Sequence, residues 1–411
     1  MTRGHGARIG PAELALAIGL YALQGVVVAY LVNYNKAYMV AGGVDERKAG
    51  LVETAVLLTL VFKFVLGPVS DRFSPLGLGH RRPFIVAGLA VGSLGLLGLT
   101  AVPPGSSLAG YAAMAFLAVG GLALYDTCAD GLIVDVTPPG DRARVQGLVQ
   151  VARFLATMGC TLGFGLWMAR TGIGPGRSDG VLRACAGLGL PPMALALLVR
   201  ERARPDVAEA FDWKALGVVL RPGGLALLAF GALYGIIGLG VEFNLSRYYV
   251  ALGYDQDGVG WFGAARYGGR AAGALLLPAL KGRLGRRGML AAGIVALAAT
   301  TAGQAVASGP AATGAWAFAF GMANGWNDAL FCVLAMEASD PRMAASTFAI
   351  FMAVSNLSVA GDALFLEAVV GLGRGYAPVF LISSALALGL LGLVPALSRH
   401  RAGGPAGDVA P

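Results

Sequence analysis

Acidic side chains stand inside long apolar stretches of this sequence. Asp126 and Asp130 lie one helical turn apart in the segment LALYDTCADGLIVD, and Asp328 lies in the segment NGWNDALFCVL. A carboxylate inside hydrocarbon costs several kcal/mol unless it is paired or hydrated, so it normally faces a cavity or another helix. A carboxyl group held in this way can bind and release a proton. We therefore predict that Asp126, Asp130 and Asp328 take up a coupling proton.

Three arginines occur at comparable depths. Arg153 lies on the apolar segment that follows Asp126, and at 1.5 Å per residue the two reach similar heights, which predicts an ion pair between them. Arg266 and Arg270 share one face of a later segment. Such guanidinium groups can bind an anionic group of a substrate, or they can form fixed structural ion pairs. Both alternatives stay open, and the first makes all three arginines substrate-binding residues.

Uncharged polar side chains also occur deep in the apolar segments. There they can contact a substrate or form hydrogen bonds between helices, and the sequence does not choose between these roles. The candidates for substrate contact are Gln24, Tyr234, Asn324, Asn327 and Asn356.

A further set of polar residues lies near the ends of three apolar segments, around residues 33–36, 53 and 242–247. The mirrored placement suggests an outer gate or a vestibule that recognises substrate, although side chains that merely extend to the membrane surface give the same pattern. The outer-gate candidates are Asn33, Lys36, Glu53, Glu242, Asn244 and Arg247.

Long membrane-spanning helices must hold these residues. Of the 411 residues, 56% are hydrophobic and only 13% are charged, and the mean hydropathy is +0.69. Soluble domains carry roughly 25% charged residues, so this composition excludes a water-soluble globule and predicts an all-α polytopic membrane protein. A span needs about 20 apolar residues, which predicts twelve spans. They cover residues 11–39, 47–70, 83–102, 107–136, 142–170, 179–199, 223–251, 257–281, 288–308, 311–338, 343–370 and 376–397.

The distribution of positive charge predicts the topology. Most of the 31 Lys and Arg residues fall in the termini and in loops that lie on one side of the twelve-span arrangement. The net charge of +8 is therefore explained by the excess of Lys and Arg that orients a protein in the membrane. No nucleic-acid partner is implied. We expect an inner (cytoplasmic) membrane protein with both termini cytoplasmic and an uncleaved first span.

The chain repeats itself in two halves. Asn33 and Lys36 match Asn244 and Arg247 in spacing, and the nine-residue separation of Asp126 and Asp135 recurs in Asp328 and Glu337. Transporters are often built from such repeats. We predict six-helix bundles at residues 1–199 and 222–398, a cytoplasmic linker at 200–221 and a disordered tail at 399–411.

The loop between the second and third spans carries a recognisable motif. Gly67 precedes the pair Asp71 and Arg72, and the basic pair Arg81 and Arg82 follows after an inserted SPLGLG segment. In this the chain resembles the major facilitator superfamily, whose signature joins these elements between the same two helices. The longer loop is similar to that of the branch with peptidoglycan-fragment permeases, folate-biopterin transporters and acetyl-CoA transporters.

The resemblance implies two pseudo-symmetric six-helix bundles and a cytoplasmic gate. In the family, the loop carboxylate caps a neighbouring helix and pairs with basic residues in one conformation only, so Asp71 is expected to bias the inward/outward equilibrium. A purely topological role for the basic residues is the alternative. The predicted gate comprises Gly67, Asp71, Arg72, Arg81, Arg82, Asp135, Arg142 and Glu337.

These observations predict a secondary active transporter and not an enzyme. It is expected to work as a monomer and to move a small anionic or polar solute by alternating access, coupled to protons. Span 5 lacks the Gly-Pro-Gly-Gly element typical of drug/proton antiporters, which favours symport. The three His and four Cys residues suggest no metal site or cofactor.

Two other classes remain as alternatives. An intramembrane prenyltransferase could use Asp126, Asp130 and Asp135 to hold magnesium and a diphosphate, although the spacing and the span count differ from that enzyme class. A non-transporting facilitator-fold protein could assemble or deliver other membrane components.

Overall fold

A computed structural model of the chain describes residues 9–75, 79–199, 213–254, 256–356, 364–365, 368–369 and 373–399. Most of the predicted linker (200–212), part of the eleventh predicted span and the tail from residue 400 lie outside the described residues.

The first half is a succession of helices. They are α1 (Pro11–Asn33), α2 (Asn35–Ala41), α3 (Glu46–Leu58), η1 (Thr59–Phe62), α4 (Lys63–Arg72), α5 (Arg82–Ala101), α6 (Leu108–Val136), α7 (Arg142–Thr171), α8 (Asp179–Gly187) and α9 (Leu190–Leu198).

The second half is also helical. It contains η3 (Trp213–Leu216), α11 (Gly217–Leu220), α12 (Pro222–Ala251), α13 (Gln256–Ala305), α14 (Gly309–Ala338), η4 (Pro341–Met343), α15 (Ala344–Asn356), α17 (Tyr376–Gly389), η6 (Leu390–Leu393) and α18 (Val394–Arg399).

The helices agree with twelve spans. Nine helical segments of the described chain are long and apolar enough to cross a membrane, and one of them, Gly258–Ala305, holds two spans. The chain reverses there at Gly285, whose φ of 60° lies in the left-handed region that favours glycine. The 30-residue α14, which is rich in polar residues, and the described part of α15 complete the set.

Four predicted spans are interrupted, two of them by a 3₁₀ turn: η1 separates α3 from α4, and η6 separates α17 from α18. The first helix ends at Asn33, and α2 begins at Asn35, because the backbone of Tyr34 leaves helical geometry (φ −126°, ψ −24°). The predicted span 179–199 divides into α8 and α9, where Pro191 and Pro192 occupy the first turn of α9. Proline lacks the amide hydrogen needed inside a helix but fits its first turn, which explains the new start.

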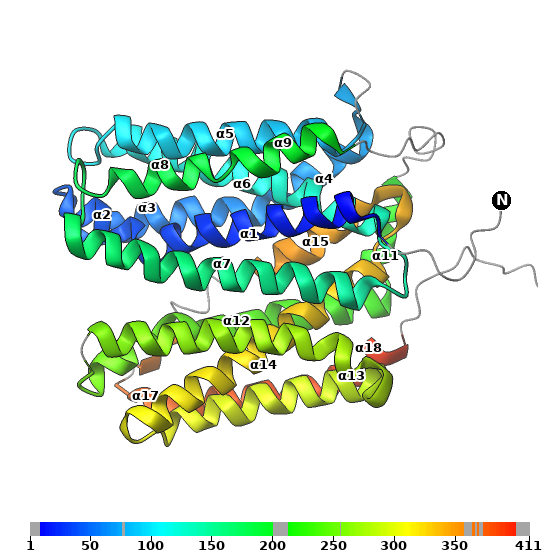
Figure 1. Ribbon diagram of the computed structural model, residues 1–411. Helices are drawn as coiled ribbons and strands as arrows, with labels where there is room; N and C mark the ends of the chain where they lie inside the picture. Colours follow the sequence, from blue (N-terminus) through cyan, green and yellow to red (C-terminus); the bar gives the residue numbers. More distant parts are fainter. Residues whose placement is uncertain are drawn as a thin grey trace, which may run out of the picture.

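The helices gather into two groups, one from α1 to α9 and one from α12 to α18, with α15 reaching toward the first group (Figure 1). Contacts between the groups run along α7 with α13 and α14, and along α15 with α4 and α6. One apolar core lies wholly within the first half, and a second core joins the second half to buried residues of α1, α6 and α7.

Helical glycines of this chain lie in different environments. Gly88 on α5 touches α6, since a Cβ there would lie 2.6 Å from the Tyr125 backbone nitrogen. Gly159 and Gly163 also fit a helix-packing spacing, yet no atom lies within 4 Å of a Cβ at either position. Spacing alone does not reveal which face of α7 meets a neighbour, so a glycine pair four residues apart does not by itself mark a helix contact.

This contrast gives a stability prediction. Gly88→Val should destabilise the protein by about 1–3 kcal/mol because the new methyl groups would force α5 and α6 apart. Gly163→Val, at an equally helical but open position, is the matched control. Thermal unfolding of the two purified variants in detergent measures the difference, and equal unfolding temperatures would contradict the assigned α5–α6 contact.

Candidate functional site

The middle of the first half holds a buried ion pair. Lys63, at the start of α4, pairs with Asp126 on α6, and both side chains are at most 4% exposed. Gln24 on α1 donates to the same carboxylate oxygen at 3.1 Å. One oxygen of the Asp126 carboxylate therefore has two donors, an ammonium group and an amide.

Asp130 lies one turn along α6 and has a different environment. Its Oδ1 accepts a hydrogen bond of 2.6 Å from the Tyr21 hydroxyl of α1, and the residue is 4% exposed. Tyr21 is its only direct hydrogen-bond or ion-pair partner among the described residues.

The second half holds a larger charged group at a similar depth. Arg270 on α13 pairs with Asp328 on α14 and lies 2.6 Å from the carboxylate of Glu242 on α12. Arg266, one turn along α13, lies 3.5 Å from the same Glu242 carboxylate. Tyr234 of α12 donates to Asp328, so four charged groups and a phenol form one connected network.

Arg153 connects the two halves. The expected pair with Asp126 is wrong, because Lys63 occupies that carboxylate and Arg153 instead lies 3.7 Å from Asp328. The rise per residue predicts the height of a side chain along a helix but not the direction in which it points. On α7 that direction is toward the second half.

The uncharged candidates divide into two groups. Gln24 and Tyr234 contact the carboxylates described above. Asn327 donates to the carbonyls of Gly293 and Ala323, a geometry that favours the helix-packing role left open by the sequence.

The two other asparagines differ from each other. Asn356 donates to the Leu60 carbonyl and so joins α15 to η1 of the first half. Asn324 is 1% exposed, and neither end of its amide has a hydrogen-bond partner in the described part of the chain. Of the three candidate asparagines, Asn324 alone has both ends of its side-chain amide without a partner in the described part of the chain, and it lies on the same helix as Asp328.

A cavity of about 620 Å³ separates the halves at the end of the bundle that carries α2. Its wall includes five of the predicted outer-gate residues and reaches Arg266. Glu242 lies at its floor and is only 5% exposed, about 13 Å from the end of α12, so it belongs to the charged network more than to an outer gate. The other four outer-gate candidates in its wall are Asn33, Lys36, Glu53 and Arg247.

The remaining gate candidates make local contacts. Lys36 pairs with Glu46 at 3.0 Å across the α2–α3 connection. Asn244 is fully buried and accepts a hydrogen bond of 3.1 Å from Arg247, so it orients the arginine and does not itself line the cavity.

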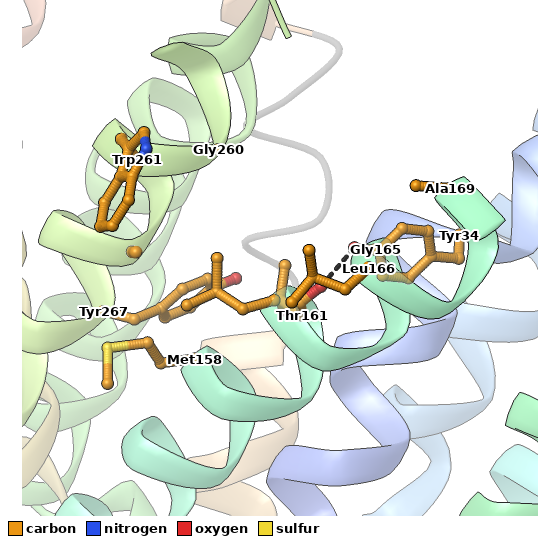
Figure 2. Close-up of a pocket in the computed structure, with 11 residues that line it drawn as sticks. Tyr34, Met158, Thr161, Gly165, Leu166, Ala169, Gly260, Trp261 and Tyr267 are labelled. Carbon is orange, nitrogen blue, oxygen red and sulfur yellow. Dashed lines mark hydrogen bonds between the residues drawn. The ribbon is translucent and has the colours of Figure 1, made fainter. Parts of the chain in front are cut away.

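A second, more apolar cavity of about 530 Å³ opens between α7 and α13 (Figure 2). Tyr34 and Leu166 lie on one side, and Trp261 lies on the other. Tyr267 lines both this cavity and the larger one, so the two spaces are neighbours.

The halves meet at the opposite end, called the basic end below because it carries the loop with Arg72, Arg81 and Arg82. Asp71 at the end of α4 accepts from the backbone amide of Ser346 at 2.7 Å and from the Ser346 hydroxyl, at the start of α15. Arg81 pairs with Asp71 from the other side. A carboxylate at a helix N-terminus is favoured by the helix dipole, so Asp71 holds α15 to the first half.

Gly67 makes this approach possible. A Cβ at Gly67 would lie 2.6 Å from the Ser346 Cα, inside the backbone of α15. The motif glycine therefore permits the two helices to come close enough for Asp71 to reach the α15 amides.

Ion pairs at the basic end repeat in the two halves. Arg81 lies 3.2 Å from Asp135 in the first half, and Arg286 pairs with Glu337 in the second. Arg142 lines a small cavity beside Glu337.

The other two basic gate candidates lie nearer the surface. Arg72 is exposed, with its guanidinium 5.7 Å from the centre of the Phe73 ring. Arg82 donates to the Leu197 carbonyl of α9.

Sequence reasoning missed two contributors. Lys63 is a charged residue inside a predicted span, the same signal that selected the aspartates, and it was available from the sequence. Ser346 carries no comparable signal, because a serine near a helix start is common and its partner Asp71 is 275 residues away.

A helical membrane bundle with charged residues around an internal cavity has the architecture of a solute transporter. Comparison with known sequences gives its family: the profile described as Major Facilitator Superfamily matches residues 12–361, and the chain belongs to this superfamily. It is therefore a multi-pass membrane transporter of the secondary type, and the prenyltransferase alternative is set aside.

Individual relatives are distant. The anhydromuropeptide permease of Escherichia coli strain K12 is 26% identical over 178 residues, which cover 43% of this chain. The aligned part spans only 35% of that permease.

Solved structures show the same fold. The proton:xylose symporter XylE, bound to 6-bromo-6-deoxy-D-glucose, matches with a TM-score of 0.71 at 12% identity, over 94% of this chain and 95% of XylE. The human organic anion transporter MFSD10 also gives 0.71, at 14% identity, over 94% of this chain and all of MFSD10. These likenesses establish the two-bundle facilitator fold.

The contact at the basic end gives a prediction for Asp71. Asp71→Ala removes the cap of α15 and should speed hydrogen exchange of the Ala345 and Ser346 amides by about fivefold to thirtyfold, since a lost cap costs about 1–2 kcal/mol. Exchange measured by mass spectrometry in nanodiscs tests this.

Asp45 provides the matched control. It caps α3 through the amides of Arg47 and Lys48 but makes this contact within one half. Asp45→Ala should leave exchange at the start of α15 unchanged. Equal exchange there in Asp71→Ala and wild type would contradict the assigned link between the halves.

Proposed function

We propose that this protein is a proton-coupled symporter that moves a small anionic or polar solute across a bacterial inner membrane, with both termini in the cytoplasm. In this orientation the large cavity faces outward and the basic end is closed. The chain then rests in an outward-facing conformation of an alternating-access cycle.

The observation that carries this proposal is the position of Asp328 between an arginine of its own half and an arginine of the other half. Its carboxylate is shared between Arg270 of its own half and Arg153 of the other half. An anionic substrate group can replace Asp328 as the partner of either guanidinium. Binding would then change the contacts between the halves, which is what a carrier requires.

Uptake into proteoliposomes tests the function directly. A labelled anhydromuropeptide is the first probe, because a distant relative is a permease for that class and a peptide offers carboxylates to arginine. Labelled pterins and acyl-CoA thioesters complete the panel. We expect accumulation of one of these solutes under an inward proton gradient and its loss when a protonophore is added.

The opposite result favours the non-transporting alternative. Absence of flux for the entire panel, together with a membrane protein that co-purifies stoichiometrically, would replace the carrier with an assembly or delivery protein.

Arg153 gives a mutational prediction. Arg153→Gln should raise the KM for the transported solute about tenfold or more, because a charge-assisted hydrogen bond contributes roughly 1.5–3 kcal/mol. Arg153→Lys should restore only part of the affinity, since lysine lacks the planar pair of donors. Arg144→Gln, which changes an exposed arginine on the same helix, is the control. An unchanged KM in Arg153→Gln would remove this residue from the binding site.

A further inference from the structure

Acidic and basic side chains are equal in number at the centre of the bundle. The central charged cluster is defined here as the basic residues Lys63, Arg153, Arg266 and Arg270 and the acidic residues Asp126, Asp130, Glu242 and Asp328. With every group ionised, this cluster is neutral. Loss of charge at any one carboxylate therefore leaves it with one positive charge in excess.

The carboxylates are not equivalent. Asp328 contacts Arg270 and Arg153, and Glu242 contacts Arg270 and Arg266. Asp126 has Lys63. Asp130 alone lacks direct contact with a cation within the described residues and has a neutral phenol instead.

Charged and titratable groups reach Asp130 from five helices. Tyr21 of α1 contacts it directly, while Lys63 of α4, Arg153 of α7 and Cys332 of α14 interact with it at longer range. Both of these cations have another carboxylate as their ion-pair partner. The fifth group, Asp126, lies one turn away on α6 itself, and its negative charge makes a second negative charge at Asp130 unfavourable.

These contacts favour a neutral Asp130 carboxyl group. A buried carboxylate without a cation is costly, and a nearby carboxylate that shares the only local ammonium group raises that cost. The Tyr21 hydroxyl occupies Oδ1, which leaves the second oxygen for a proton.

Within the proton-coupled transport proposed above, we propose that Asp130 carries the transported proton and that its protonation provides one uncompensated positive charge, at Arg153, for an anionic group of the substrate. Arg153 is the most accessible cation of the cluster. Its side chain is 22% exposed, against 4% for Lys63, 8% for Arg266 and 7% for Arg270.

This assignment links the proton to the substrate through charge balance. A proton from the outer solution adds to the Asp130 carboxylate, and the cluster then attracts one anionic group to Arg153. When the cluster opens toward the basic end, the proton leaves Asp130 for that solution. The cluster becomes neutral, Arg153 returns to Asp328, and the anion is released. One proton thus accompanies one negative charge.

Infrared spectroscopy tests the protonation of Asp130 without any substrate. In the full-length protein in nanodiscs at neutral pH, a protonated buried carboxyl group gives a carbonyl stretch that an ionised one lacks. Wild type should show this band and Asp130→Asn should lose it. Asp45→Asn, which changes an exposed carboxylate and preserves a helix-capping residue, should keep it.

Two further variants separate the assignment from a simple folding defect. Asp126→Asn frees the Lys63 ammonium group for Asp130 and should abolish the band at neutral pH. Lys63→Met removes the shared cation and should strengthen the band, because Asp126 then also takes a proton. A wild type without the band, or a band that persists in Asp130→Asn, would overturn the assignment.

A transport experiment distinguishes this inference from the proposed function. With the labelled anhydromuropeptide, Asp130→Asn should keep solute exchange across the membrane. Its accumulation of the solute under a proton gradient should be at least tenfold lower than that of wild type. Full accumulation in this variant would overturn the inference while leaving the symporter intact. If wild type itself fails to accumulate the probe, the proposed substrate fails, and the infrared result still decides the state of Asp130.

Discussion

A charge in the hydrocarbon part of a membrane needs a partner, because its surroundings solvate it poorly. This constraint organises the centre of the protein. The pair of Lys63 and Asp126 joins α4 to α6, and the pair of Arg270 and Asp328 joins α13 to α14. The ion pairs that stabilise these charges inside the membrane also hold the helices that carry them next to each other. The same pairs can therefore hold the fold together and, under the proposed function, bind substrate, since an anionic solute would compete with a carboxylate that is already paired.

The contacts that join the halves differ from those within each half. At the basic end, Asp71 of the first half caps α15 of the second, and Gly67 provides the close approach. Near the centre, Arg153 reaches Asp328 across the same boundary. At the other end a cavity of about 620 Å³ separates the halves. A rocking motion needs to break the Asp71 and Arg153 contacts, whereas the pairs within each half can move as units.

Much of the fold follows from the sequence, and less of the site does. Apolar length and the Asp71 motif predicted the spans and the family, because the hydrocarbon thickness and the closed helix hydrogen bonds leave few alternatives. The partner of Arg153 was predicted incorrectly, since height along a helix does not fix direction. Lys63 was recognisable but overlooked. The capping of α15 through Ser346 depends on tertiary structure and has no local signal.

The central claim is that the halves rock about this charged centre and so open it to each side in turn. Electron spin distance measurements between labels at Leu51 of α3 and Val250 of α12, both exposed near the outer end, test it most directly in nanodiscs. The account predicts a long and a short distance whose proportions change between alkaline and acidic solution, as the cluster loses or gains a proton. A single distance, unaffected by pH and by the transported solute, would contradict it.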